Sequence, residues 1–81
     1  MLKVKMEKYK NLSNDSGIKY FEVGPDRITI MFTSNWVYVY SNTSCGSENV
    51  KEMVRLARLG DGLNSFIMTN VAGDYETKYK L

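Results

Sequence analysis

Apolar and polar residues alternate along three neighbouring segments, and this period of two predicts three consecutive β-strands. The segments cover residues 18–23, 27–33 and 36–40. Gly24-Pro25-Asp26 separates the first two, and its proline presets a backbone angle that suits a tight turn. Ser34-Asn35 predicts a two-residue hairpin before the third strand, because asparagine tolerates a positive φ. Such short connections favour antiparallel pairing, so we expect an antiparallel meander.

The third of these segments carries large side chains on both of its predicted faces. Trp36, Tyr38 and Tyr40 share one face, and Val37 and Val39 share the other, which favours a strand inside the sheet. The aromatic rings could form a stacking platform for single-stranded RNA, or they could be core side chains beneath the helices. We favour the core for at least part of the set, and the sequence does not decide which face the helices cover.

The N-terminal segment predicts a further strand with one charged face. Leu2, Val4 and Met6 alternate with Lys3 and Lys5. Lysines placed in this way are typical of a protected sheet edge.

Two later segments have the 3.6-residue spacing of amphipathic helices. The first is expected to start at Ser47 as its N-cap and to end where Gly60 takes up a left-handed conformation. The second is expected over residues 62–70, with Asp61 as its cap.

Together these elements predict an α+β fold: a three- or four-stranded antiparallel meander with two C-terminal helices packed on one face. The 81 residues suffice for one hydrophobic core, so we expect a single domain, 1–81, in which residues 1–11 and 76–81 are tails or edge strands. A single cysteine excludes an intrachain disulfide, and no stretch predicts a signal peptide or membrane span. We therefore expect a cytoplasmic protein.

The residue inventory argues against catalysis. The chain has no histidine, which excludes Ser–His–Asp and Cys–His mechanisms and histidine-containing metal sites. Cys45 lies in the polar segment 41–46, which predicts a loop just ahead of the first helix. A helix N-terminus can activate a thiol, but no side-chain base accompanies it, and we favour an ordinary loop cysteine. The sequence predicts no enzyme activity, no cofactor and no metal.

Basic residues gather in two places, although the formal net charge is only +2. The first ten residues contain four lysines, Lys3 and Lys5 among them, against one glutamate. Lys51, Arg55 and Arg58 form a stripe along the first helix. Both groups can be solvated surface or can contact the phosphates of a nucleic acid.

The order of motifs resembles the KTSC domain, a short module found in bacterial and phage proteins and at the C-terminus of some lysyl-tRNA synthetases. The resemblance covers about residues 12–75 and rests on a serine-containing loop before an isoleucine, a central Tyr-x-Tyr motif, and a later glycine, aromatic, isoleucine and final aromatic. In this chain these are Ser13–Ile18, Tyr38-Val39-Tyr40, Gly60 or Gly62, Phe66, Ile67 or Val71, and Tyr75. The family often has a Val-Pro pair where this chain has Ser44-Cys45-Gly46-Ser47. The resemblance implies RNA binding and no established activity.

These observations predict a small non-enzymatic binding domain for RNA. The residues expected to contact RNA are Tyr38, Tyr40, Lys51, Arg55, Arg58, Lys3 and Lys5. The alternative is a protein-interaction or self-associating module of bacterial or phage origin, with a second copy or a host protein as its partner. It is suggested by the small core and by the alternating N-terminal strand, which could add to another sheet.

Overall fold

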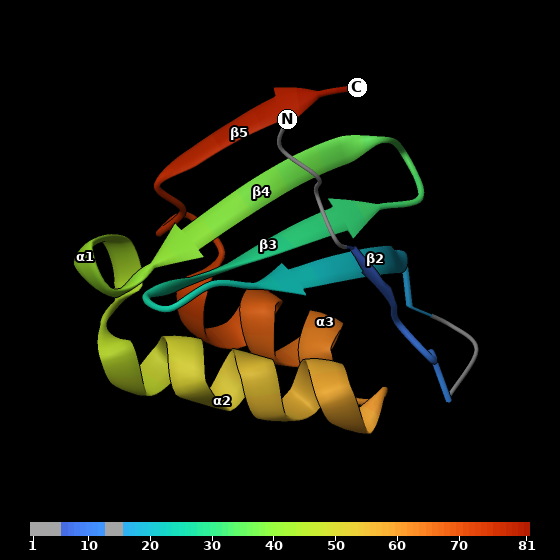
Figure 1. The fold of residues 1–81 in the computed structure, drawn as a ribbon, viewed down its shortest axis with the longest axis horizontal. Coiled ribbons are helices and arrows are strands. Elements are labelled where there is room, and N and C mark those ends of the chain that lie inside the picture. The colour runs from blue at the N-terminus through green and yellow to red at the C-terminus, as the bar shows by residue number, and fades with distance from the viewer. Residues whose placement is uncertain (1–5, 13–15) are drawn as a thin grey trace.

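The computed structural model describes residues 6–12 and 16–81, and the predicted strand positions before Met6 lie outside these ranges. The described residues form a five-stranded antiparallel sheet in the order β1-β2-β3-β4-β5, with helices on one of its faces (Figure 1). The strands are β1 (Glu7–Lys8), β2 (Ile18–Val23), β3 (Arg27–Phe32), β4 (Trp36–Ser41) and β5 (Thr77–Lys80). The helices are α1 (Asn42–Cys45), α2 (Ser47–Leu59), α3 (Leu63–Phe66) and the π-helix η1 (Ile67–Val71).

The predicted α+β class with an antiparallel meander is confirmed, but the strand and helix counts differ from the predicted three or four strands and two helices. The sheet gains β5 from residues 77–80, which pair antiparallel with β4 and place Lys78 opposite Tyr38. At the other edge, β1 pairs with β2 over only two residues. The strand β4 is therefore an inner strand, as its bulky faces predict.

The two predicted turns connect the strands, but one is longer than expected. The Gly24 N–H donates to the Arg27 carbonyl at 2.9 Å and closes the first turn. The second connection spans residues 33–35 rather than two residues. Asn35 has a φ of 72°, as expected of a three-residue hairpin that ends in a left-handed residue.

The helices cover the face of β4 that carries its aromatic side chains. Tyr40 pairs with Ile28 and Tyr38 with Ile30, so these side chains point to the same side of the sheet. Tyr40, Ile28 and Ile30 are at most 1% exposed and pack with buried side chains from the helices. The core members from the helices are Val50, Met53, Leu56, Ala57, Leu63, Ile67 and Val71. The core interpretation is confirmed for Tyr40, and Tyr38 is only partly buried.

A bulge in β2 changes the predicted alternation of that strand. The pairing register shifts between Ile18 and Tyr20, so the strict period of two breaks there. Both Ile18 and Phe21 are 2% exposed and belong to one core cluster, although the alternation predicts opposite faces.

Tyr9 connects the N-terminal part of the chain to the helices. Its side chain is 3% exposed within the core cluster, and its hydroxyl accepts the Leu63 N–H at 3.3 Å. Leu63 is the first residue of α3, and its N–H has no partner within the helix. The Tyr9 hydroxyl therefore caps this end of the helix. The predicted cap, Asp61, is wrong, because the N-cap of α3 is Gly62.

The polar segment 41–46 is not a loop, because α1 occupies most of it. The hydroxyl of Ser41 accepts the Ser44 N–H at 3.1 Å, and the Ser44 hydroxyl accepts the Ser41 N–H at 3.0 Å, which forms a reciprocal capping box. Ser47 is not an N-cap but the first residue of α2, after Gly46.

Gly60 ends α2 as predicted, with a φ of 86°. A Cβ at this position would lie 2.6 Å from the Cβ of Lys10, so alanine would combine a strained backbone with a clash. We expect Gly60→Ala to lower the free energy of unfolding by about 1–2 kcal/mol from the left-handed backbone alone. Gly73→Ala is the matched control, because nothing lies within 4 Å of its added Cβ. Urea denaturation of both variants measures the difference, and equal stabilities would contradict the assignment.

Candidate functional site

An aromatic groove lies on the helix side of the sheet, between residues of β3 and β4 and residues of the π-helix η1. Its volume is about 230 Å³. The lining residues are Phe32, Ser34, Trp36, Tyr38, Tyr40, Ile67, Met68 and Ala72. We call this surface the aromatic groove. The side chain of Met68 is 67% exposed on the π-helix, a helix type that often occurs at functional sites.

Tyr38 is the centre of the aromatic contacts in and beside this groove. Its ring lies 5.4 Å from that of Phe32 and 5.1 Å from that of Tyr75, in both cases nearly perpendicular. The ring of Tyr40 stacks against that of Tyr38, with 6.3 Å between the centroids and an interplanar angle of 12°. Contacts of this kind stabilise ring orientations by about 0.5–1.5 kcal/mol each, so the groove wall is preorganised.

A lysine from the last strand lies against the same rings. The Nζ of Lys78 is 5.4 Å from the ring centroids of Trp36 and Tyr75 and 5.8 Å from that of Tyr38. These distances fall within the range of cation–π attraction. Trp36, Tyr38 and Tyr75 together are called the ammonium cage below.

The register of β5 explains why its lysines reach this face. Lys78 pairs with Tyr38 and Lys80 with Trp36, and directly paired residues share a side of the sheet. Tyr79 pairs with Val37 and therefore points to the opposite face. Alternation along the four residues thus directs both lysines to the face of the sheet that carries the aromatic groove.

The structure separates the predicted contact residues. Tyr38 and Tyr40 both line the groove, but Tyr40 is 1% exposed and cannot serve as a stacking surface, whereas Tyr38 is half-buried. Lys51 and Arg58 are exposed on α2, which Figure 1 shows on the side of the molecule away from β5. Lys3 and Lys5 lie outside the described residues. The aromatic positions and the helix stripe therefore do not form one site.

Arg55 is engaged within its own helix. Its guanidinium donates two hydrogen bonds to the Glu52 carboxylate, at 3.0 and 2.6 Å. The hydrogen bond to Arg55 lowers the pKa of Glu52, and the pKa of Arg55 is raised by the same bond. The helix stripe is thus partly neutralised by a neighbouring acid.

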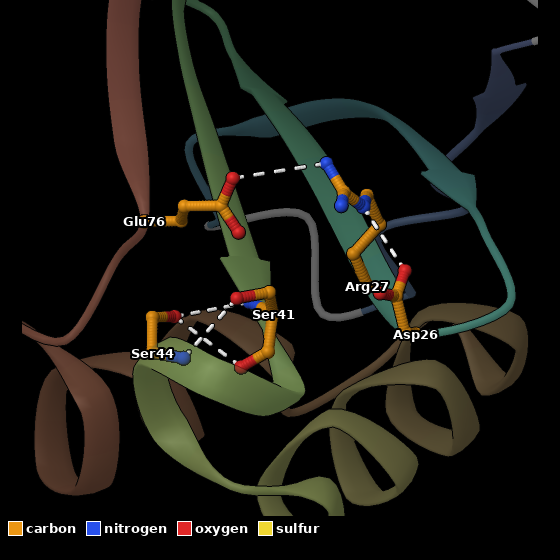
Figure 2. A network of polar contacts seen from close by, with 5 residues as sticks. All are labelled: Asp26, Arg27, Ser41, Ser44 and Glu76. Atoms are coloured by element: carbon orange, nitrogen blue, oxygen red, sulfur yellow. Dashed lines mark hydrogen bonds and ion pairs between the residues drawn. The ribbon is translucent and has the colours of Figure 1, made fainter.

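A second arginine is engaged where the strands β3, β4 and β5 meet the short helix α1. The Nε of Arg27 donates to Asp26 at 3.1 Å, and its Nη1 lies 3.8 Å from the Glu76 carboxylate (Figure 2). Below them, the Ser41–Ser44 capping box fixes the end of β4. The hydrogen bond to Asp26 raises the pKa of Arg27. The contacts to Asp26 and Glu76 engage this cation locally.

Cys45 is held as a neutral thiol. Its Sγ donates to the Ser41 carbonyl at 3.5 Å, and burial raises the pKa of the thiol. A raised pKa lowers the thiolate fraction, which disfavours the reactive-thiol alternative.

Other chemistry is not apparent in the part of the chain that the structure describes. Within residues 6–12 and 16–81, no three cysteine or acidic side chains gather as metal ligands do. The helices in these same ranges are all too short or too polar to cross a bilayer.

The fold and the aromatic groove define a small antiparallel α+β domain with one preorganised aromatic surface beside a lysine-bearing edge strand. No protein family, curated protein or solved structure was found to match the chain. The resemblance to the KTSC domain therefore stays a prediction that rests on the residues quoted for it.

Proposed function

We propose that this protein is a non-enzymatic domain that binds single-stranded RNA, with one base in the aromatic groove and the backbone on the lysines of β5. The observation that carries the proposal is the placement of two half-buried rings, Trp36 and Tyr38, beside the ammonium of Lys78. Aromatic rings stack on bases of any sequence, and lysines neutralise phosphates.

The size of the aromatic groove fits one planar ring. Its volume of about 230 Å³ lies below the range of about 300–1,000 Å³ that drug-sized ligands need. Stacking one base on an aromatic side chain contributes about 1–3 kcal/mol. This is enough for recognition of an unpaired base and too little for tight binding without further contacts.

The expected electrostatic contribution to RNA binding is small, and it can be measured as the dependence of the affinity on salt. Lys78 and Lys80 have no ion pair within the described residues, whereas Arg27 and Arg55 do. Two phosphate contacts on a single strand correspond to a slope of about −1.4 in log K against log salt. A dedicated polyanion binder would show a much steeper dependence.

A titration with single-stranded RNA at low salt tests the proposal, because Trp36 is the only tryptophan in the chain and lines the groove. We expect quenching of Trp36 fluorescence on binding. Lys78→Ala should weaken binding several-fold and reduce the salt slope by about 0.7. Circular dichroism of the variant checks that its fold is intact.

Lys51→Ala is the matched control, because Lys51 is equally basic and exposed but lies on α2. We expect it to leave the affinity unchanged. If both variants weakened RNA binding equally, the RNA site would be assigned to the helix stripe. If no binding were observed at low salt, RNA would be rejected as the ligand.

The alternative is a self-associating or protein-binding edge. The alternating N-terminal strand that suggests it lies mostly outside the described residues, where β1 covers only Glu7–Lys8. At the other edge of the sheet, all four residues of β5 are exposed and two of them are Lys78 and Lys80. Lysines on an edge strand disfavour the addition of another strand.

A further inference from the structure

The ammonium cage has the composition of a site for methylated ammonium groups. We propose that Trp36, Tyr38 and Tyr75 bind an N-methylated ammonium ligand, and that Lys78 occupies this site as an internal competitor. The inference concerns a different ligand from RNA and does not depend on RNA binding.

The three rings approach a single cation from different directions. Their centroids lie 5.4 to 5.8 Å from the Nζ of Lys78. Tyr38 and Tyr75 are nearly perpendicular, at 84°, so these two rings do not stack on one another. Several ring faces around one ammonium are the arrangement that recognises choline and methyl-lysine groups.

The cage selects for a weakly hydrated cation. Lys78 has no ion pair among the described residues, so ring faces rather than a carboxylate hold its ammonium. A primary ammonium is compact and strongly hydrated, and it loses favourable hydration when it enters such a site. Methyl groups spread the charge and weaken hydration, which favours transfer into an aromatic site.

Lys78 is poised to leave the cage. It belongs to the edge strand β5, whose four residues are all exposed. A tethered lysine acts at a high effective concentration, so it lowers the apparent affinity for a ligand in solution. Removing its ammonium should therefore increase ligand affinity, the opposite of the effect expected for RNA.

The test measures Trp36 fluorescence during titration with choline. We expect Lys78→Ala to bind choline about tenfold more tightly than the unmodified protein. The neutral tert-butyl isostere, in which carbon replaces the charged nitrogen, should not bind. Adding Tyr75→Leu to Lys78→Ala should abolish choline binding. Lys78→Thr repeats the experiment with a residue that favours β-strands, should the alanine variant not fold.

Each result is decisive. A folded Lys78→Ala or Lys78→Thr variant that does not respond to choline would overturn the proposal and leave the cage as a structural contact. Equal binding of the neutral isostere would also overturn it, because the site would then be only hydrophobic. Choline binding without RNA binding would reject the RNA proposal alone, and the reverse would reject this one alone.

Discussion

Replacing Tyr40 with alanine is expected to lower the free energy of unfolding by about 3–5 kcal/mol. The side chain is 1% exposed and is among the largest of the fully buried ones. It packs beneath Tyr38 and pairs with Ile28 in the neighbouring strand. The truncation leaves a cavity where sheet and helices meet. Domains of this size unfold at a cost of about 5–15 kcal/mol, so a large part of the stability would be lost.

Tyr79→Ala is the matched control for that variant. Tyr79 lies on β5, is 47% exposed and faces away from the helices through its pairing with Val37. We expect this variant to lose no more than about 0.5 kcal/mol, as is usual for surface changes. Urea denaturation followed by circular dichroism compares the two. A Tyr40→Ala loss no larger than the Tyr79→Ala loss would contradict the core assignment.

Alkaline pH is expected to destabilise the protein through the same residue. Burial, and to a smaller extent the nearby Tyr38, Cys45, Tyr75 and Asp74, raises the pKa of Tyr40 to about 12, from 10. The folded state therefore favours the neutral phenol. This contribution to stability is fully present below pH 10 and is lost as pH rises toward 12. At about 1.4 kcal/mol per pKa unit, the loss approaches about 2–3 kcal/mol.

Tyr40→Phe isolates this effect, because phenylalanine keeps the ring and removes the ionisable hydroxyl. Stability of the two proteins is measured by urea denaturation at a series of pH values across that interval. The unmodified protein should lose stability more steeply than the variant. Parallel curves would show that Tyr40 does not carry the alkaline transition.

The parts of the fold that the sequence predicts well are those with a long local pattern. The alternation in residues 18–23, 27–33 and 36–40 gives three of the strands almost to the residue. The amphipathic spacing after Ser47 and the stop at Gly60 give α2. In each case the signal is contained in neighbouring residues, so no knowledge of the rest of the chain is needed.

The parts that the sequence does not predict depend on partners distant in the chain. Along residues 78–81, Lys78 and Lys80 alternate with Tyr79 and Leu81, but a pattern this short does not distinguish an edge strand from a tail. The strand β5 forms because β4 offers an edge for pairing. The bulge that brings Ile18 into the core and the hydroxyl of Tyr9 at Leu63 are also tertiary features. Local periodicity contains no signal for the bulge or for the Tyr9 contact, and it does not decide whether residues 76–81 form a strand.

The candidate site was predictable only in part. The sequence of the aromatic strand is compatible with core side chains and with surface side chains. In the structure, Tyr40 is buried in the core, whereas Trp36 and Tyr38 are half-buried at the groove. The helical spacing does not specify where η1 meets this face of the sheet. Tyr75 and Lys78 complete the surface from the last residues of the fold.

The pairing of β5 with β4 has a consequence for aggregation. Residues 36–40 are uncharged, aromatic and β-branched, and segments of this composition stack readily into cross-β fibrils when their edge is exposed. The strand β5 occupies that edge and places lysines beside it. Such charged residues act as gatekeepers of hydrophobic strands. The last strand of the fold thus shields the most amyloid-like stretch of the protein from other chains.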